Sequence, residues 1–221
     1  MIKACIFDLD GTLTDTVESI ARGVNKALVH FGYSKRPVEE YNFYAGDGID
    51  MALKRALAAA GDTEGRCLEA GIPLCRKYFG EDPLYHVKPY PQIRETVEAL
   101  KARGVKNAVF SNKPHTAAVQ VVEAVFGKGF FDYIQGQTAE IPRKPDPAGV
   151  FRIMKEFSVQ PEECLYFGDT NTDMETGHAA GLYTVGVAWG FRPRSELEAY
   201  HADCIINQPA EILQVYREKN R

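Results

Sequence analysis

The stretch ACIFDLDGTLTDT, residues 4–16, combines a strand pattern with two closely spaced carboxylates. Its apolar run, Ala4 to Phe7, predicts a buried strand, and Asp8 and Asp10 follow at the end of that strand. Side chains two residues apart on a strand share a face, so these negative charges repel each other unless a cation lies between them or one carboxyl group is protonated. The stretch therefore predicts a site that needs a metal ion, a proton or both.

The composition is that of an ordinary globular protein, because 45% of the 221 residues are hydrophobic and 25% are charged. A net charge of -4 does not favour nucleic acid as a partner. The five cysteines are scattered without a CxxC pair, which is typical of buried, reduced thiols. No run approaches the length of a membrane span, and Asp8 lies where a signal peptide needs an apolar core. We expect a soluble, cytoplasmic protein, a monomer or homodimer, with no membrane or nucleic-acid partner.

The periodicity of apolar residues changes along the chain. Helical spacing predicts a helix from Val17 to Phe31, ended by Gly32, and residues 33 to about 85 carry only helical patterns. From residue 91 onward, strands and helices alternate, with helices predicted at 93–103, 115–126, 147–157 and 171–180 and strands at 105–110, 133–135, 164–168, 183–188 and 203–207, before a final helix. Repeated βα units imply a parallel sheet with both faces covered.

The sequence thus predicts an α/β fold with a Rossmann-like parallel sheet core, residues 1–14 and 88–221, and an inserted α-helical domain, residues 15–87. The hinges of the insertion are expected near 13–16 and 85–91. In open parallel sheets, ligands bind outside the carboxyl ends of the strands, so the candidate functional residues are those that follow each strand.

Four strand ends carry residues with suitable chemistry. Asp8 and Asp10 follow the first strand. The second strand end carries Ser111, Asn112 and Lys113 just before a helix, where a hydroxyl, an amide and free backbone N–H groups make a phosphate cradle.

The other two strand ends add a cation and two acids. Lys144, held beside Pro145, has less freedom than a surface lysine, which suits a fixed charge against an anion. Asp169 and Asp173 lie in the run GDTNTD, residues 168–173. Oxygen ligands from two strand ends are what Mg²⁺ takes, usually with several waters that a phosphate can replace.

Each of these residues also has a simpler interpretation. Asp169, Asp173 or the Ser111–Asn112 pair can cap a helix N-terminus, and Lys144 can lie on the solvated surface. Compatible acid, cation and phosphate-cradle chemistry at four strand ends favours a single site over four separate structural roles.

The motifs DLDGT at 8–12, Ser111, Lys144 and GDTNTD at 168–173, in this order, resemble those of the haloacid dehalogenase-like phosphohydrolases. The resemblance covers essentially the whole chain, and the helical insertion matches the family's inserted α-helical cap.

This resemblance implies roles for the matching residues. Asp8 resembles the nucleophile that takes the phosphoryl group, and Asp10 the general acid that protonates the leaving oxygen and then activates water. Mg²⁺ would be bound by Asp8, the Asp10 backbone carbonyl and Asp169, with Asp173 supporting the waters of the metal ion. The residues implied to hold the phosphate are Gly11, Thr12, Ser111, Asn112 and Lys144. Dehalogenases and phosphonate-cleaving members lack an aspartate where this chain has Asp10, so the resemblance favours P–O cleavage.

The insertion carries a second resemblance, to phosphoglycolate phosphatases. Residues 46–57, GDGIDMALKRAL, look like their Gly-x-Gly cap loop, as do SNKP at 111–114 and GVAWG at 186–190. Gly46 and Gly48 would let the loop close over a small substrate, and Arg55 is a candidate cation for a carboxylate. Alternatively, this segment is an ordinary helix start with Arg55 in solvent.

We therefore expect a Mg²⁺-dependent phosphatase that acts through an aspartyl-phosphate on a small phosphorylated metabolite, with 2-phosphoglycolate converted to glycolate and phosphate. The alternatives are a β-phosphoglucomutase-like mutase, a pyrophosphatase, a sugar-phosphate phosphatase, or a phosphate-binding module without turnover. Trp189 is expected to pack at the rim of the site and is given no role.

Overall fold

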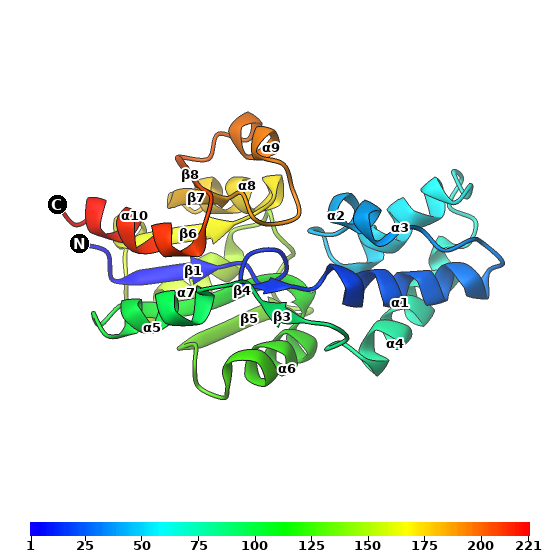
Figure 1. Cartoon of the computed structure of the whole chain (residues 1–221), viewed down its shortest axis with the longest axis horizontal. Coiled ribbons are helices and arrows are strands. Elements are labelled where there is room, and N and C mark those ends of the chain that lie inside the picture. The colour runs from blue at the N-terminus through cyan, green and yellow to red at the C-terminus, as the bar shows by residue number, and fades with distance from the viewer. The chain divides into compact units, whose positions relative to one another are not determined.

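The computed structural model describes residues 1–221, which divide into two compact units. One unit comprises residues 1–15 and 88–221, and the other residues 16–87 (Figure 1). The first of these divisions falls one residue after the predicted boundary between residues 14 and 15. Asp15 pairs with Lys88 in a two-stranded antiparallel sheet of β2 (Thr14–Asp15) and β3 (Lys88–Pro89), which keeps Asp15 in the first unit.

The first unit is built on a six-stranded parallel sheet, which confirms the predicted α/β fold with a Rossmann-like core. The strand order is β5-β4-β1-β6-β7-β8, so β1 lies between β4 and β6. The strands are β1 (Ala4–Phe7), β4 (Lys106–Pro114), β5 (Tyr133–Gln137), β6 (Cys164–Gly168), β7 (Tyr183–Val187) and β8 (Cys204–Ile206).

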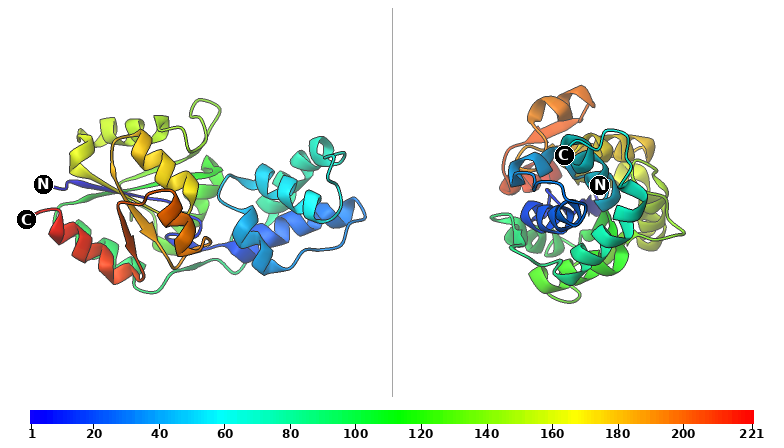
Figure 2. Two further views of the ribbon diagram at one scale, coloured as in Figure 1. Left: turned by 90° about the horizontal axis from the view of Figure 1, so that it is seen from above. Right: turned by 90° about the vertical axis from the view of Figure 1, so that its right-hand side faces the viewer.

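Helices cover both faces of this sheet. In the left view of Figure 2, the yellow-green α7 lies on one face and the red α10 on the other. The helices are α5 (Ile93–Lys101), α6 (His115–Phe126), α7 (Ala148–Phe157), α8 (Asn171–Ala179), α9 (Arg194–Ala199) and α10 (Ile212–Glu218), with 3-10 turns at Pro161–Glu163 and Pro209–Glu211. α9 was not predicted, because its six residues follow Pro193 in a segment read as a turn.

The core of the first unit forms on both faces of β1, whose four residues are all buried, as expected of a central parallel strand. On one face, Ala4 and Ile6 join a cluster that includes Val150 and Ile153 of α7. Phe7 stacks on Phe167 of β6, with ring centroids 4.9 Å apart. The end of β1 is therefore rigidly held where the first carboxylates follow.

The second unit consists of helices and turns, as predicted. Its elements are α1 (Val17–His30), a 3-10 turn (Val38–Glu40), α2 (Tyr41–Tyr44), α3 (Ile49–Ala59) and α4 (Leu68–Glu81). α1 and α4 pack closely, because a Cβ on Gly23 would lie 3.0 Å from the Phe79 backbone. None of the helices of the chain has the length and apolar character that crossing a membrane requires. All five cysteines are free.

Gly149 in α7 provides a test of how tightly α7 packs on the sheet. A Cβ at this position would overlap the Phe110 ring, so we expect Gly149→Ala to lower the free energy of unfolding by about 1–3 kcal/mol. Urea denaturation followed by circular dichroism measures the change. Gly80→Ala in α4 is the control, because that position is open and alanine favours helix by up to about 1 kcal/mol. An unchanged free energy in Gly149→Ala would contradict the packing described.

Candidate active site

The register of the central strands brings two aspartates together at the carboxyl edge of the sheet. Phe7 of β1 pairs with Phe167 of β6, and the Asp8 N–H donates a hydrogen bond of 2.9 Å to the Phe167 carbonyl. Asp8 and Asp169 therefore emerge next to each other, each one residue beyond the end of its strand. This is the position at which parallel sheets bind ligands.

Asp173 reaches the same place from the first turn of α8. Thr170 caps this helix, and its N–H and hydroxyl groups donate to Asp173 Oδ2 at 3.1 and 2.8 Å. The close approach requires Gly168, where a Cβ would overlap the Asp173 side chain. One oxygen of Asp173 therefore takes part in the helix cap. Its other oxygen, Oδ1, is left for contacts within the site.

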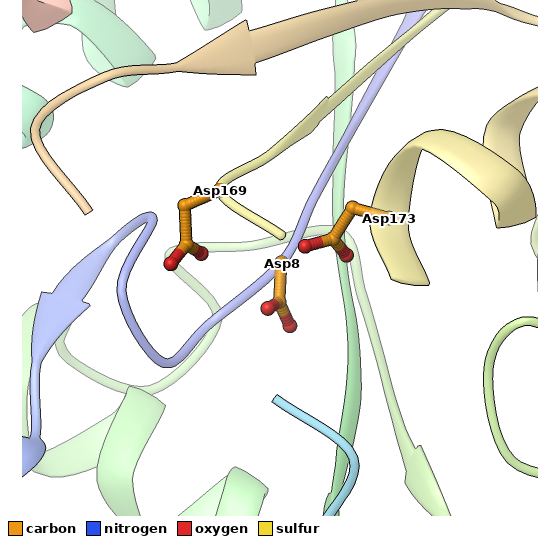
Figure 3. A group of neighbouring side chains, drawn as sticks. All are labelled: Asp8, Asp169 and Asp173. Carbon is orange, nitrogen blue, oxygen red and sulfur yellow. The ribbon is translucent and has the colours of Figure 1, made fainter. Parts of the chain in front are cut away.

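Asp8, Asp169 and Asp173 form a buried cluster, drawn in Figure 3, in which one carboxylate oxygen of each lies within 4.8 Å of the others. Their exposed fractions are 4%, 0% and 0%. We call these three residues the aspartate cluster. Concentrating three acids in a site that excludes water is costly unless cations balance them.

Lys144 supplies one balancing charge. Its Nζ lies 2.8 Å from Asp8 Oδ1 and 2.7 Å from Asp173 Oδ1, and its side chain is 1% exposed. Burial works against the charge on Lys144, but Asp173 and Asp8 outweigh it and raise its pKa well above the ordinary value. Lys144 is therefore a permanent cation of the site.

Burial also governs the carboxyl groups of the cluster. It raises the pKa of Asp8 well above its ordinary value, against the attraction of Lys144 and with the repulsion of Asp173 and Asp169. Burial and then the charge of Asp173 raise the pKa of Asp169 to about 7, against hydrogen bonds from the Phe191 N–H and the Thr12 hydroxyl. One lysine does not balance this cluster.

The cluster fits a divalent cation. Asp8 Oδ1 is buried and, although it is ion-paired with Lys144, it has no aligned hydrogen-bond donor. Three buried carboxylates that share one lysine form the oxygen-rich donor set that hard divalent cations prefer.

Asp10 lies outside the cluster and has its own lysine. Lys113 Nζ lies 2.9 and 3.1 Å from the two oxygens of Asp10, and the lysine side chain is only 2% exposed. Sequence reasoning missed this role for Lys113. The sequence feature that could have indicated this role is the position of Lys113 directly after a buried strand. A lysine buried there needs a carboxylate partner.

The Ser111–Lys113 segment differs from the prediction, which placed it in a loop after a strand ending at Phe110. β4 continues to Pro114, because Pro114 pairs with Gln137 of β5 after an irregularity in register. Within this extension, Ser111 Oγ accepts the Lys113 N–H at 3.2 Å.

Asn112, on the same extension, holds the main chain of Lys144. The Lys144 N–H donates to Asn112 Oδ1 at 2.8 Å, and Asn112 Nδ2 donates to the Lys144 carbonyl at 3.4 Å. These two hydrogen bonds fix the main chain of Lys144, whose ammonium group lies among the carboxylates of the site.

Gly11 and Thr12 contact Asp169. A Cβ on Gly11, whose φ is +91°, would overlap the Asp169 carboxylate. The Thr12 hydroxyl donates to Asp169 Oδ1 at 2.8 Å. The Thr12 side chain thus holds the aspartate cluster.

Gly46, Gly48 and Arg55 lie in the second unit. The glycines adopt φ values of +107° and +88°, which side chains disfavour. The Arg55 guanidinium pairs with Asp47 and donates to the Tyr44 carbonyl at 2.9 Å, so it holds the loop between α2 and α3.

Comparisons with known proteins agree with this fold. A model of the haloacid dehalogenase-like hydrolase family matches residues 5–187. A phosphoglycolate phosphatase from Aquifex aeolicus is 31% identical over 214 residues, which cover 97% of this chain and 96% of the relative. One from Haemophilus influenzae is 33% identical over 217 residues, covering 95% and 96%.

Solved structures give the same result. A crystal structure described as a predicted phosphoglycolate phosphatase from Haemophilus somnus is 27% identical, with a TM-score of 0.88 and coverage of 97% of this chain and 98% of the other. A β-phosphoglucomutase from Clostridium difficile, 21% identical with a TM-score of 0.79 over 99% and 97% of the two chains, shares the fold.

The chain therefore belongs to the haloacid dehalogenase-like hydrolases. Within that family it lies in the phosphoglycolate phosphatase-like branch. The predicted family and the predicted enzyme class, a phosphoric monoester hydrolase, are confirmed.

The ion pairs of Lys144 with Asp8 and Asp173 can be tested by measuring the free energy of unfolding. Without metal, Lys144→Met leaves Asp8 and Asp173 buried without their partner, so we expect a loss of about 3–5 kcal/mol in the free energy of unfolding. A carboxyl group with a raised pKa stabilises the fold in its protonated form, and this contribution is lost as pH rises through that pKa. The deficit should therefore be larger at about pH 8 than at about pH 5.

Urea denaturation in EDTA measures this deficit. Lys106→Met is the control, because Lys106 forms an exposed ion pair with Asp132 that contributes about 0–1 kcal/mol. A Lys144→Met deficit as small as the control at both pH values would show that the charges are not coupled as described.

Proposed function

We propose that this chain is a Mg²⁺-dependent phosphatase that hydrolyses a small phosphate monoester through an aspartyl-phosphate on Asp8, and that its substrate is 2-phosphoglycolate. The observation that carries the proposal is the aspartate cluster around Lys144, with Asp10 two residues beyond Asp8. A cation site, a carboxylate nucleophile and a separate carboxyl group for proton transfer are the parts this reaction needs.

Mg²⁺ would be bound by Asp8, the backbone carbonyl of Asp10 and Asp169, with Asp173 supporting its waters. When bound, the ion would neutralise charge on the phosphate and on the attacking carboxylate. The burial of Asp8, Asp169 and Asp173 within 4.8 Å of one another, with a single lysine among them, supports this assignment.

In the first step, an oxygen of Asp8 attacks phosphorus and the bond from phosphorus to the ester oxygen breaks. Asp10 donates its proton to that oxygen, and the alcohol leaves. In the second step, water attacks phosphorus, Asp10 takes a proton from the water, and the bond between Asp8 and phosphorus breaks. Inorganic phosphate is released and both carboxyl groups return to their starting state.

The protein must also offset the charge of the phosphate. Lys144 lies beside Asp8 with its ammonium group fully buried, so it can balance negative charge on the transferring group without reorganising. The residues proposed to contact the phosphate are Gly11, Thr12, Ser111, Asn112 and Lys144.

The choice of 2-phosphoglycolate rests on relatives and on the cap loop. The curated relatives that share about a third of their residues with this chain are named phosphoglycolate phosphatases. Gly46, Gly48 and Arg55 of the second unit are proposed as the substrate loop, and Arg55, which pairs with Asp47 in this structure, is the proposed cation for a substrate carboxylate.

The proposal predicts Mg²⁺-dependent release of phosphate from 2-phosphoglycolate, which EDTA abolishes. Asp8→Asn keeps the shape of the side chain but removes the nucleophile, so we expect turnover to fall by about 10⁴-fold or more. Phosphate release measured with purified protein checks this, and a native-like circular dichroism spectrum with a cooperative unfolding transition excludes a folding defect. Turnover retained in Asp8→Asn would reject the nucleophile.

A panel of substrates separates the alternatives in the same assay. Preferred turnover of pyrophosphate or a hexose phosphate would reject 2-phosphoglycolate. A sugar product that keeps its phosphate would indicate a mutase. Tight phosphate binding with no turnover of any substrate would indicate a binding module.

Lys113 generates a separate prediction. It holds both oxygens of Asp10, so Lys113→Met should release the acid–base group from its position and lower kcat by about 10²-fold with little change in KM. Lys113→Arg should recover part of kcat because it keeps the charge. Steady-state kinetics with Lys106→Met as the control would make this check, and an unchanged kcat would exclude the positioning role.

A further inference from the structure

The turn after β7, residues 188–192, contacts Asp169. The Phe191 N–H donates to Asp169 Oδ2 at 2.8 Å. The Trp189 indole N–H donates to the backbone carbonyl of Thr12 at 3.0 Å, and the Thr12 hydroxyl donates to Asp169 Oδ1 at 2.8 Å. Both oxygens of Asp169 are thus held, one of them by a residue that Trp189 fixes.

Two glycines enclose the same carboxylate. A Cβ on Gly11 would overlap the Asp169 carboxylate, and a Cβ on Gly190, next to Trp189, would overlap the Asp169 Cβ and lie 2.5 Å from the Gly11 carbonyl. The backbone of the DLDGT turn and the backbone of the 188–192 turn therefore close on Asp169 from two sides. Asp169 can stay in this position only while the two turns keep their positions relative to each other.

The indole hydrogen bond is a side-chain bond that joins the two turns across 177 residues of sequence. Trp189 is half-buried, and its N–H is directed at a main-chain carbonyl rather than at solvent. Packing at a rim alone does not require this bond, because an aromatic ring can pack there without donating a hydrogen bond. The bond has a consequence for Thr12, whose hydroxyl can reach Asp169 only from a fixed main chain.

We infer that Trp189 is a positioning residue for the metal site, which acts through Thr12 to hold Asp169 in its ligating orientation. The inference rests on the proposed function, because it takes Asp169 as a ligand of Mg²⁺. Groups that orient a metal ligand commonly change metal affinity by about 10–100-fold when removed. Trp189 is the single tryptophan of the chain, so its emission also reports on this turn directly.

The test measures Mg²⁺ binding rather than turnover. Isothermal titration of the whole chain with MgCl₂, without substrate, gives Kd for wild type, Trp189→Phe, Thr12→Val and the double variant. We expect Kd to rise by about tenfold in Trp189→Phe and by at least as much in Thr12→Val. The double variant should match Thr12→Val, because both changes break the same path.

Thr12→Ser, which keeps the hydroxyl, is the matched control and should bind Mg²⁺ close to the wild-type Kd. Wild-type binding with an unchanged Kd in Trp189→Phe would overturn the inference and leave the proposed function intact. Additive effects in the double variant would also overturn it, since Trp189 would then act by another route. Failure of the wild type to bind Mg²⁺ would instead reject the metal on which the proposed function depends.

Tryptophan emission of the unmodified protein keeps the inference testable even if a variant fails to fold. Titration with MgCl₂ should change this emission in a saturable way, with the same Kd as calorimetry. Asp169→Asn should abolish the change. Calorimetric binding without any change in emission would contradict the coupling between Trp189 and the metal site.

Discussion

The constraint on which the site depends is the burial of the aspartate cluster with only one lysine among its carboxylates. Ionised groups in a site that excludes water repel strongly, and a buried charge without a partner is among the most destabilising features a fold can have. Lys144 contacts Asp8 and Asp173, while Asp169 is held by neutral donors. The site therefore has less positive than negative charge, and a bound divalent cation would balance the difference. The same carboxylates would then affect both the stability of the fold and the proposed chemistry.

The parallel sheet holds the carboxylates of this cluster close together despite their repulsion. Strands β1 and β6 end side by side, and their apolar residues are fully buried, so the backbone that carries Asp8 and Asp169 has little freedom. Rigid placement matters because carboxylates must be held close before any ion binds. Lys144 is fixed in turn by its main-chain bonds to Asn112, which lies on the extension of β4. Core packing, strand register and electrostatics thus act on the same few residues.

Much of this could be predicted from the sequence, because alternation of strand and helix patterns places strand ends at one edge of the sheet. That rule was enough to group Asp8, Asp169, Asp173 and Lys144, which the structure brings together. The pair of short strands at residues 14–15 and 88–89 was missed, because two residues carry no periodic signal.

The contacts of Lys113 and Trp189 were missed for another reason. Lys113 meets Asp10 across 103 residues, and Trp189 meets Thr12 across 177, and neither pairing leaves a local pattern in the sequence. The extension of β4 is set by pairing with β5 and likewise depends on a distant segment. Local pattern therefore predicts the candidate residues of the site, whereas their partners come only from the folded chain.

The central claim is that the phosphoryl group passes through Asp8. Turnover of 2-phosphoglycolate with Mg²⁺ can be stopped with acid and the protein reduced with borohydride, which converts an aspartyl-phosphate to homoserine. Peptide mass spectrometry then shows which residue was phosphorylated. We expect homoserine in place of Asp8 and in place of no other aspartate. Phosphate release with no modified residue, or modification of a different aspartate, would contradict it.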